Sequence, residues 1–372
     1  MKKILFISHD ATRTGAPILL LNLVKLILSF GNYEVNFILL KGGELESEFK
    51  DLAPTFCLNE KKSKGNLLRN RFFKMKSILE DSLFLNQYHC IVSNTITNGG
   101  ILEIVKSNYN GPIVSYVHEL EIACKTYTTT DDLKKVIQNT DVFCVPCNLV
   151  KDFLHVNLGV SYLKISELPY YIHNKSAIVS GTNLHHDQFI IGGCGTIDWR
   201  KGPDLFVQVA TQLFLLRPDI SIVFKWKGAY KGIELERLQY QLEKANLGGK
   251  VFFEFTSDNM ATFYDVIDLL LLTSREDPYP LVVLEAASYA KPSICFDEVC
   301  GSKDFINKSD GGIVVPFLDI QAIVSSILKF YDDESYRKQK GENAKHFLLD
   351  THSNKQYVYN EFETLIKNLN LN

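Results

Sequence analysis

The sequence has no hydrophobic run long enough to cross a membrane and no excess of charge of either sign. Its longest apolar segment, residues 18–30, is interrupted by Asn22 and Lys25 and falls short of the roughly 20 apolar residues that a transmembrane helix needs. The apolar run at the start ends at His9, too early for a secretory signal. A formal net charge of −3 gives no reason to expect nucleic acid. We therefore expect a soluble, cytoplasmic protein with no nucleic-acid partner.

Complete metal-binding patterns are also missing. The eight cysteines are scattered, and most stand in apolar runs, as around Cys90, Cys194 and Cys295, which is typical of small buried hydrophobes in a reducing compartment. Cys144 and Cys147 form a CxxC pair that would supply half of a zinc or redox site, but no second CxxC or nearby CxxH completes it. We predict no metal site.

Strand and helix patterns alternate along the chain in two passes, one before and one after a polar stretch at about residue 180. Short continuous apolar runs between helical periods are typical of buried parallel strands with helices on both faces. A chain of 372 residues also exceeds the usual size of one hydrophobic core. We predict an α/β protein of two Rossmann-like, doubly wound domains, residues 1–170 and 189–353, joined by a linker at 171–188.

The last segment, residues 354–369, has the apolar spacing of an amphipathic helix with no strand after it. Two placements fit this pattern. The helix caps the second domain, or it crosses back so that residues 354–372 complete the first.

The stretch GGCGTIDWRKGPDLF, residues 192–206, predicts an anion site. It begins like a GxGxxG dinucleotide motif, but Asp198 occupies the third glycine position, so that motif fails. Arg200 and Lys201 stand just before a helix whose expected first residue is Pro203, so two cations meet the positive end of a helix dipole. The alternative is a pair of solvated charges on a turn.

A second stretch, SREDPYPLVVLEAASYAKP at residues 274–292, places carboxylates beside this anion site. Asp277 precedes the start of a helix and Glu285 lies about one turn inside it. Carboxylates repel phosphate, so they should contact neutral hydroxyl groups, and a carboxylate accepts strong hydrogen bonds from the vicinal hydroxyls of a sugar or ribose. The helix dipole would account for Asp277 alone, but not for Glu285.

These two stretches, together with GSKDFINKSDGGIVVP at residues 301–316, resemble the second domain of the family-four glycosyltransferases of the GT-B fold. The resemblance implies two domains facing a cleft. Asp277 and Glu285 match the spacing of the family's paired acids, which implies that Glu285 binds the ribose of a nucleotide. Asp277, or the adjacent Glu276, would then hold hydroxyls of the transferred sugar. Lys201 matches the lysine that meets the diphosphate.

The resemblance also carries over backbone amides and two residues of the first domain. Where the family has its helix-start loop, this chain has DPYPLV: Pro280 lacks an amide, while the amides of Tyr279, Leu281 and Val282 remain to meet the donor. Gly15 matches a glycine loop in which a Cβ would obstruct a phosphate or sugar, although a plain tight turn is the alternative. His118 matches a histidine aimed at the donor sugar, against the simpler interpretation of a structural histidine.

One position departs from the pattern: Thr196 stands where the family has an arginine, and we expect Arg200 to substitute for it. The leaving phosphate would be stabilised by Lys201, Arg200 and helix-end amides, and no DxD ends a strand to hold a metal ion. We therefore predict a metal-independent transferase with no cofactor. It would move a sugar from a nucleoside-diphosphate sugar to a glycan or lipid-linked acceptor, with retention, in surface polysaccharide biosynthesis.

Two features bear on partners and alternatives. Residues 61–76 hold seven basic and no acidic side chains, which fits either peripheral contact with the inner face of a membrane or a solvated helix. A nucleotide-sugar epimerase of the same fold is an alternative function. A catalytically weakened binding protein is another, suggested by Thr196 and Pro280. A glycoside hydrolase would also use paired acids, but it needs no anion site.

Overall fold

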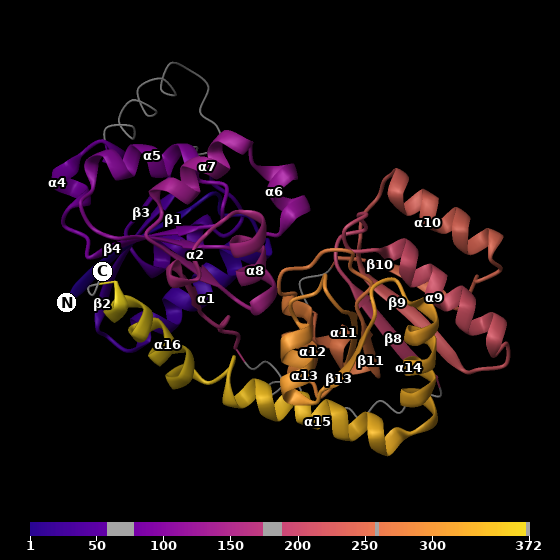
Figure 1. The fold of residues 1–372 in the computed structure, drawn as a ribbon. Helices are drawn as coiled ribbons and strands as arrows, with labels where there is room; N and C mark the ends of the chain where they lie inside the picture. Colours follow the sequence, from indigo (N-terminus) through magenta and orange to yellow (C-terminus); the bar gives the residue numbers. More distant parts are fainter. Residues whose placement is uncertain (58–77, 174–187, 257–259, 370–372) are drawn as a thin grey trace. The chain divides into compact units, whose positions relative to one another are not determined.

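The computed structural model describes residues 1–57, 78–173, 188–256 and 260–369, and they form two α/β units. Unit 1 comprises Met1–Ile172 and Lys355–Asn372, and unit 2 comprises His173–Asn354. Each unit has its own parallel sheet (Figure 1), which confirms the predicted fold class. No helix in the described part of the chain is long and apolar enough to span a bilayer.

Unit 1 is built on a seven-stranded parallel sheet in the order β3-β2-β1-β4-β5-β6-β7. Its strands consist largely of consecutive buried apolar residues, because helices cover both faces of the sheet. The strands are β1 (Lys2–Ser8), β2 (Tyr33–Leu39), β3 (Thr55–Cys57), β4 (Cys90–Asn94), β5 (Ile113–Tyr116), β6 (Val142–Val145) and β7 (Ile165–Glu167). The helices are α1 (Gly15–Ser29), α2 (Glu46–Leu52), α4 (Ser82–Leu85), α5 (Gly99–Asn108), α6 (Glu121–Tyr127), α7 (Thr130–Asn139), α8 (Asn148–Asp152) and α16 (Lys355–Asn368).

The helices of unit 1 pack in two groups. Helix α5 lies beside α7, and α1 contacts both α2 and α16 (Figure 1). Helix α1 begins at Gly15 rather than near residue 18, where the apolar period starts. The basic segment at residues 61–76, for which a solvated helix was one interpretation, falls outside the described residues.

The C-terminal helix α16 packs in unit 1. The ring of Tyr359 stacks on Phe30 with centroids 3.9 Å apart, and its hydroxyl accepts a hydrogen bond from Asn32 Nδ2 at 2.6 Å. Tyr33 at the start of β2 donates to Glu363 at 2.5 Å. Of the two placements that the sequence left open, the structure has the one in which this segment joins the first unit.

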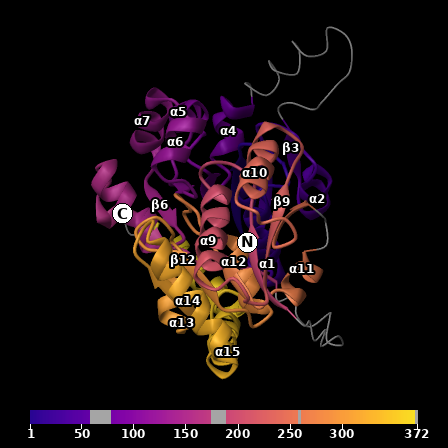
Figure 2. The ribbon, with the colours of Figure 1, turned by 90° about the vertical axis from the view of Figure 1, so that its right-hand side faces the viewer.

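Unit 2 is built on a six-stranded parallel sheet in the order β10-β9-β8-β11-β12-β13. The strands are β8 (Phe189–Cys194), β9 (Ile222–Ala229), β10 (Val251–Phe255), β11 (Leu269–Leu271), β12 (Ser293–Phe296) and β13 (Gly312–Val315). The helices are α9 (Pro203–Leu216), α10 (Ile233–Lys244), α11 (Ala261–Val266), α12 (Leu281–Ser288), α13 (Lys303–Ser309), α14 (Ile320–Asp332) and α15 (Glu334–Asp350). Helix α9 packs beside α10 and α14, while α15 contacts α12, α13 and α14 (Figure 2).

Strand order fixes where each unit can hold a ligand. In unit 1 the chain proceeds outward from β1 in one direction and then restarts at β4 on its other side. In unit 2 the same reversal occurs between β8 and β11. Open parallel sheets bind ligands outside the carboxyl ends of the strands at such switch points.

The segment between the two sheets was predicted as a linker at residues 171–188. The units divide after Ile172, and Tyr171 and Ile172 are buried residues assigned to unit 1. Residues 174–187 of the expected linker lie outside the described residues.

Candidate functional site

Two loops meet at the switch point of unit 2, one following β8 and the other following β11. The amide of Arg275 donates to the carbonyl oxygen of Arg200 at 2.7 Å, and Thr273 Oγ1 donates to the carbonyl oxygen of Gly202 at 2.7 Å. Gly202 has a φ of +68°, and a Cβ there would stand 2.1 Å from the Thr273 carbonyl oxygen. Only glycine lets the loop that carries Lys201 lie this close to the end of β11.

This contact brings together two of the predicted site residues. Lys201 Nζ lies 2.6 Å from Asp277 Oδ2, and the two side chains are 16% and 6% exposed. Ser274, which no sequence motif indicated, donates its hydroxyl to the same carboxylate oxygen at 3.1 Å. The cation expected at a diphosphate and the acid expected at a sugar thus neutralise each other in this structure.

The neighbouring charges hold the loops rather than form a cluster of cations. Arg200 Nη1 donates to the backbone carbonyl oxygen of Glu276 at 3.2 Å. Arg275 forms a bidentate pair with Asp204, at 2.9 and 2.6 Å. Thr196, at the position where the resemblance expects an arginine, donates to Asp198 Oδ2 at 2.5 Å. The loop after β8 is therefore a closed turn that presents Lys201 and Arg200 toward the β11 loop.

Glu285 is held by a residue that the sequence did not indicate. Its Oε2 accepts a hydrogen bond from the hydroxyl of Tyr264, on α11, at 2.7 Å. Tyr264 is buried, and burial together with the Glu285 charge raises the pKa of its hydroxyl well above 10, so it remains a donor. The Glu285 charge also helps to raise the pKa of Cys194 at the end of β8, after the larger effect of burial. Glu285 therefore lies near the carboxyl end of β8.

The start of α12 presents backbone amides at the same edge of the sheet. Pro280 is the N-cap, and the amides of Leu281 and Val282 make no backbone hydrogen bond within the described residues. These are the first-turn donors that a helix leaves for a ligand. The side chain of Tyr279 turns away into the core, where its hydroxyl lies 2.9 Å from His352 Nε2.

In unit 1, the predicted residue Gly15 lies at the start of α1, and the predicted residue His118 lies after β5. Gly15 is the first residue of α1 and not part of the loop, and a Cβ there would meet no protein atom within 4 Å. The fold itself does not require glycine at this position.

His118 follows β5, and both nitrogens of its ring are engaged. Nε2 lies 2.8 Å from Asn94 Oδ1, and Nδ1 lies 2.8 Å from the hydroxyl of Tyr170. Burial lowers the pKa of His118 to about 3, with a smaller contribution from His9, so the ring is neutral near pH 7. The ring does not direct a free nitrogen at a ligand in this structure.

The adjacent Glu119 is a second buried group that sequence reasoning missed. Its Oε2 accepts hydrogen bonds from the amides of His118, at 2.9 Å, and Ile96, at 3.2 Å. Burial raises its pKa to about 7, although these two amides act in the opposite direction. Glu119 thus joins the loops that follow β4 and β5.

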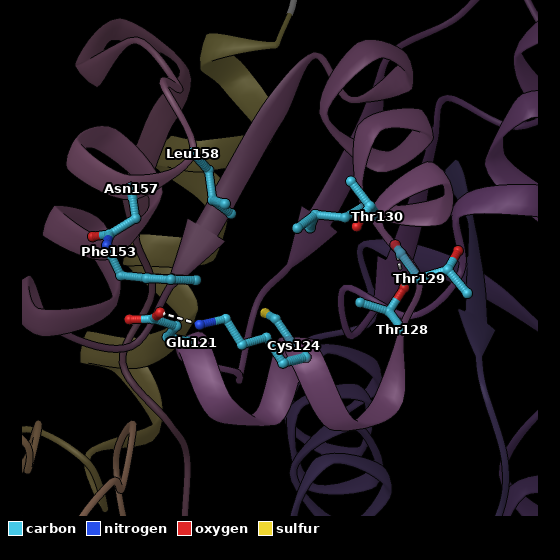
Figure 3. Close-up of a pocket in the computed structure, with 10 residues that line it drawn as sticks. Glu121, Cys124, Thr128, Thr129, Thr130, Phe153, Asn157 and Leu158 are labelled. Atoms are coloured by element: carbon cyan, nitrogen blue, oxygen red, sulfur yellow. Dashed lines mark hydrogen bonds and ion pairs between the residues drawn. The ribbon is translucent and has the colours of Figure 1, made fainter.

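Unit 1 also contains a cavity of about 430 Å³ between α6, α7 and the π-helical turn Phe153–Asn157 (Figure 3). Phe153, Asn157 and Leu158 line one side, and Thr128, Thr129 and Thr130 line the other. Cys124 of α6 stands between them, beside the Glu121–Lys125 ion pair. The lining combines apolar surface with hydroxyl, amide and charged groups. No sequence motif predicted this cavity.

Two doubly wound units with polar loops at the switch points of both sheets define the GT-B class of fold. Comparison with known proteins supports this class. The anabaena protein HepE, solved in complex with UDP and glucose, superimposes with a TM-score of 0.79 at 14% identity, over 99% of this chain and 100% of that one.

The family is indicated by sequence. Residues 174–347 match the family model "Glycosyl transferases group 1". The O-antigen biosynthesis glycosyltransferase WclY of Escherichia coli is 23% identical over 321 residues, 82% of this chain and 86% of that protein. The lipopolysaccharide core biosynthesis mannosyltransferase LpsB of Rhizobium meliloti is 27% identical over 146 residues, 38% of this chain and 41% of that protein.

The extent of these matches differs between relatives. Against three of the curated relatives the chain spans only 21%, 41% and 39% of their length. Residues 174–347, a little under half of the chain, match the group 1 glycosyltransferase model, and the fold of the chain is that of HepE. The resemblance drawn from residues 192–206, 274–292 and 301–316 is thereby confirmed.

Proposed function

We propose that the protein moves a sugar from a nucleoside-diphosphate sugar to a glycan or lipid-linked acceptor in surface polysaccharide biosynthesis, with retention of the anomeric configuration. Relatives named for O-antigen and lipopolysaccharide core biosynthesis support the pathway class. The complex of HepE with UDP and glucose supports the class of donor.

The observation that carries the proposal is the grouping at the switch point of unit 2. Lys201, Asp277 and the first amides of α12 come from two touching loops. Glu285 lies near the end of β8 and is oriented by Tyr264. A cation with helix-start amides suits a diphosphate, while an oriented carboxylate suits the vicinal hydroxyls of a ribose.

The roles follow from the chemistry of these groups. Lys201, supported by Arg200, meets the diphosphate together with the amides of Tyr279, Leu281 and Val282. Glu285 binds the ribose, and Asp277 or Glu276 binds hydroxyls of the transferred sugar. The ion pair in the structure implies an exchange, since phosphate replaces Asp277 as the partner of Lys201 while sugar hydroxyls replace Lys201 as the partner of Asp277.

The leaving diphosphate is stabilised in this proposal by protein donors alone. The amides at the start of α12 are fixed by the fold before the reaction, so they need no reorganisation as negative charge develops, and Lys201 supplies a positive charge once phosphate has replaced Asp277 as its partner. We propose that the transfer requires no metal ion. Activity measured after chelation of divalent ions tests this, and loss of activity that Mg²⁺ or Mn²⁺ restores would overturn it.

We place the acceptor on unit 1, where Gly15 starts the helix after β1 and His118 follows β5. The cavity beside α6 suits one saccharide unit of a glycan, because its lining has apolar and polar groups and sugars present both C–H faces and hydroxyl groups. The cavity is also close to His118 in the chain, since α6 begins three residues after it. Leu158→Trp should raise the KM for the acceptor and leave that for the donor unchanged. Leu163→Trp, at a fully solvated position, is the control, and equal kinetics in both variants would remove the cavity from the proposal.

Contact with the inner face of a membrane through residues 61–76 stays a proposal, because this segment lies outside the described residues. Sedimentation with anionic and with neutral liposomes tests it. Equal recovery of the protein with both kinds of liposome would exclude an electrostatic contact.

Calorimetry with a panel of nucleoside diphosphates is the first experiment, followed by incubation of the matching donor with and without glycan acceptors. We expect binding of one diphosphate, acceptor-dependent release of that diphosphate, and a product whose anomeric configuration by NMR equals that of the donor. Glu285→Gln should weaken binding, while Glu243→Gln, on the exposed face of α10, should not. Epimerised donor formed without acceptor would favour the epimerase, and binding with no turnover would favour the binding protein.

A further inference from the structure

A chain of buried polar groups crosses the switch point of unit 1 and ends on the ring of His118. Asn94, the last residue of β4, donates from Nδ2 to the carbonyl oxygen of Ala16, in the first turn of α1, at 3.1 Å. Its Oδ1 lies 2.8 Å from His118 Nε2, and His118 Nδ1 lies 2.8 Å from the Tyr170 hydroxyl. Asn94 is fully buried and Tyr170 is 3% exposed.

The direction of each hydrogen bond follows from the first. A carbonyl oxygen only accepts, so the nitrogen of the Asn94 amide must face Ala16 and its oxygen must face His118. An amide oxygen also only accepts, so His118 Nε2 must carry a proton. A neutral ring has only that one proton, so Nδ1 accepts from the hydroxyl of Tyr170.

The surroundings keep the ring neutral. Tyr116 packs against it with ring centroids 4.4 Å apart, and Tyr170 contributes its hydroxyl. Burial is the main reason that a charged ring is disfavoured, and the charge of a protonated His9 would act in the same direction. Glu119 directs its carboxylate to backbone amides. In the described part of unit 1, no carboxylate is bonded to the ring of His118.

We propose that Asn94 is a positioning residue, which fixes the tautomer and orientation of His118 and couples that ring to the first turn of α1. The inference rests on the proposed function in one respect, namely that substrate binds on unit 1 beside His118. Asn94 touches no substrate in this account. A substrate at His118 meets a neutral ring of fixed orientation, which neither gives nor takes a proton.

The coupling has a structural consequence beyond the ring. Helix α1 starts at Gly15, so the bond from Asn94 to Ala16 holds the helix start next to the end of β4. Glu119 adds a second tie between the β4 and β5 loops through Ile96 and His118. One buried amide thus links the two elements of unit 1 that carry predicted site residues.

The first test needs no activity. In the full-length protein labelled with ¹⁵N-histidine, the His118 signals, assigned with His118→Phe, should show protonated Nε2 and unprotonated Nδ1 without change between pH 5 and 8. In Asn94→Asp, a carboxylate faces Nε2, so the His118 pKa should rise and the ring should titrate within that range. Asn110→Asp, the same change in the exposed turn before β5, should leave the His118 signals unaltered. A wild-type ring protonated at Nδ1, or one that titrates, would overturn the assignment.

The second test is kinetic. Asn94→Leu and Tyr170→Phe should lower kcat by roughly 10- to 100-fold with little change in donor KM, because a misplaced group costs most in the transition state. Asn94→Asp should lose activity as the pH falls through the raised His118 pKa, and Asn110→Asp should not. If Asn94→Leu fails to fold, Tyr170→Phe and Asn94→Asp decide the result. Unchanged kcat in folded variants would overturn the positioning role.

The two tests separate this inference from the proposed function. Absence of turnover by the wild type with every donor and acceptor would refute the proposed function. The ring signals would still decide whether Asn94 fixes His118, and a wrong tautomer alongside normal transfer would refute the inference alone.

Discussion

The ion pair between Lys201 and Asp277 yields a quantitative prediction about unit 2. Two unit charges 2.6 Å apart attract by roughly 6 kcal/mol at an effective dielectric constant of about 20. The desolvation of both groups offsets much of this gain, so the pair itself contributes little net stability. Removing one partner leaves the other buried and unpaired, and Lys201→Met should lower the free energy of unfolding by about 3–5 kcal/mol.

The double variant Lys201→Met/Asp277→Leu should regain most of that loss, because neither charge is then buried alone. Urea unfolding of the full-length protein can be followed by tryptophan fluorescence, since both tryptophans, Trp199 and Trp226, belong to unit 2. Trp226 is 1% exposed and should report the loss of the core directly.

An exposed pair of nearly equal length in the same unit is the control. Lys338 and Glu334 lie 2.7 Å apart with side chains 73% and 64% exposed, so Lys338→Met should change stability by less than about 1 kcal/mol. If Lys201→Met lost no more unfolding free energy than Lys338→Met, burial would not determine the strength of this interaction. The same conclusion would follow if the loss in the double variant equalled the sum of the losses in the two single variants.

Three further changes test other parts of the structure. Gly202→Ala should destabilise unit 2 by at least about 2 kcal/mol in urea unfolding, because its Cβ would meet the Thr273 carbonyl oxygen at 2.1 Å. A Cβ at Gly248 would meet no atom within 4 Å, so an equal loss of stability in Gly248→Ala would contradict this. Tyr264→Phe should weaken nucleoside diphosphate binding about 10-fold in calorimetry, because the hydrogen bond to Glu285 is lost. If Tyr264→Phe and the exposed control Tyr240→Phe bound the diphosphate equally well, Tyr264 would not orient Glu285 for binding. Glu119, with a pKa raised from 4.5 to about 7, keeps its proton in the folded state while the unfolded chain loses it, so stability falls as the pH rises from 4.5 through 7. The free energy of unfolding of Glu119→Gln, measured by hydrogen exchange of β4 and β5, should therefore equal that of the wild type at pH 4.5 and exceed it by about 3 kcal/mol at pH 8. A difference that does not grow with pH would count against this, as would the same difference in the exposed control Glu121→Gln.

The sequence predicted the fold and the edge of the sheet at which the candidate site lies. Apolar runs and helical periods are local signals, so two doubly wound sheets could be recognised without any knowledge of contacts. The positions of Lys201, Asp277 and Glu285 relative to helix starts placed them at the carboxyl ends of strands. The strand order then brings β8 and β11 side by side, and the pair between Lys201 and Asp277 follows from that neighbourhood.

The partners of these residues could not be predicted in the same way. Tyr264 lies in a short helix with no motif, and its bond to Glu285 spans 21 residues. Asn94 ends an apolar strand, and that polar position at a switch point is the one signal that could have drawn attention to it. Tyr170 reaches His118 across 52 residues, and nothing in the adjacent sequence distinguishes it. Such contacts depend on tertiary packing, which a single sequence does not encode in any local pattern.

The two switch points differ in how they hold their polar groups, and this difference bears on the proposed chemistry. Unit 2 buries opposite charges that neutralise each other, so an incoming diphosphate can replace Asp277 as the counter-ion of Lys201, and sugar hydroxyls can replace Lys201 as hydrogen-bond donors to Asp277. Unit 1 buries neutral groups whose hydrogen bonds are all directional, from Ala16 through Asn94 to His118 and Tyr170. Among the described residues no charged group is hydrogen-bonded to the side chains of that chain, so the chain suits a part of the reaction in which geometry must be kept and no proton moves. On this argument the charge of the leaving group is handled by unit 2, and variants of Asn94 and of Lys201 should differ in their pH dependence even where they lower kcat to the same extent.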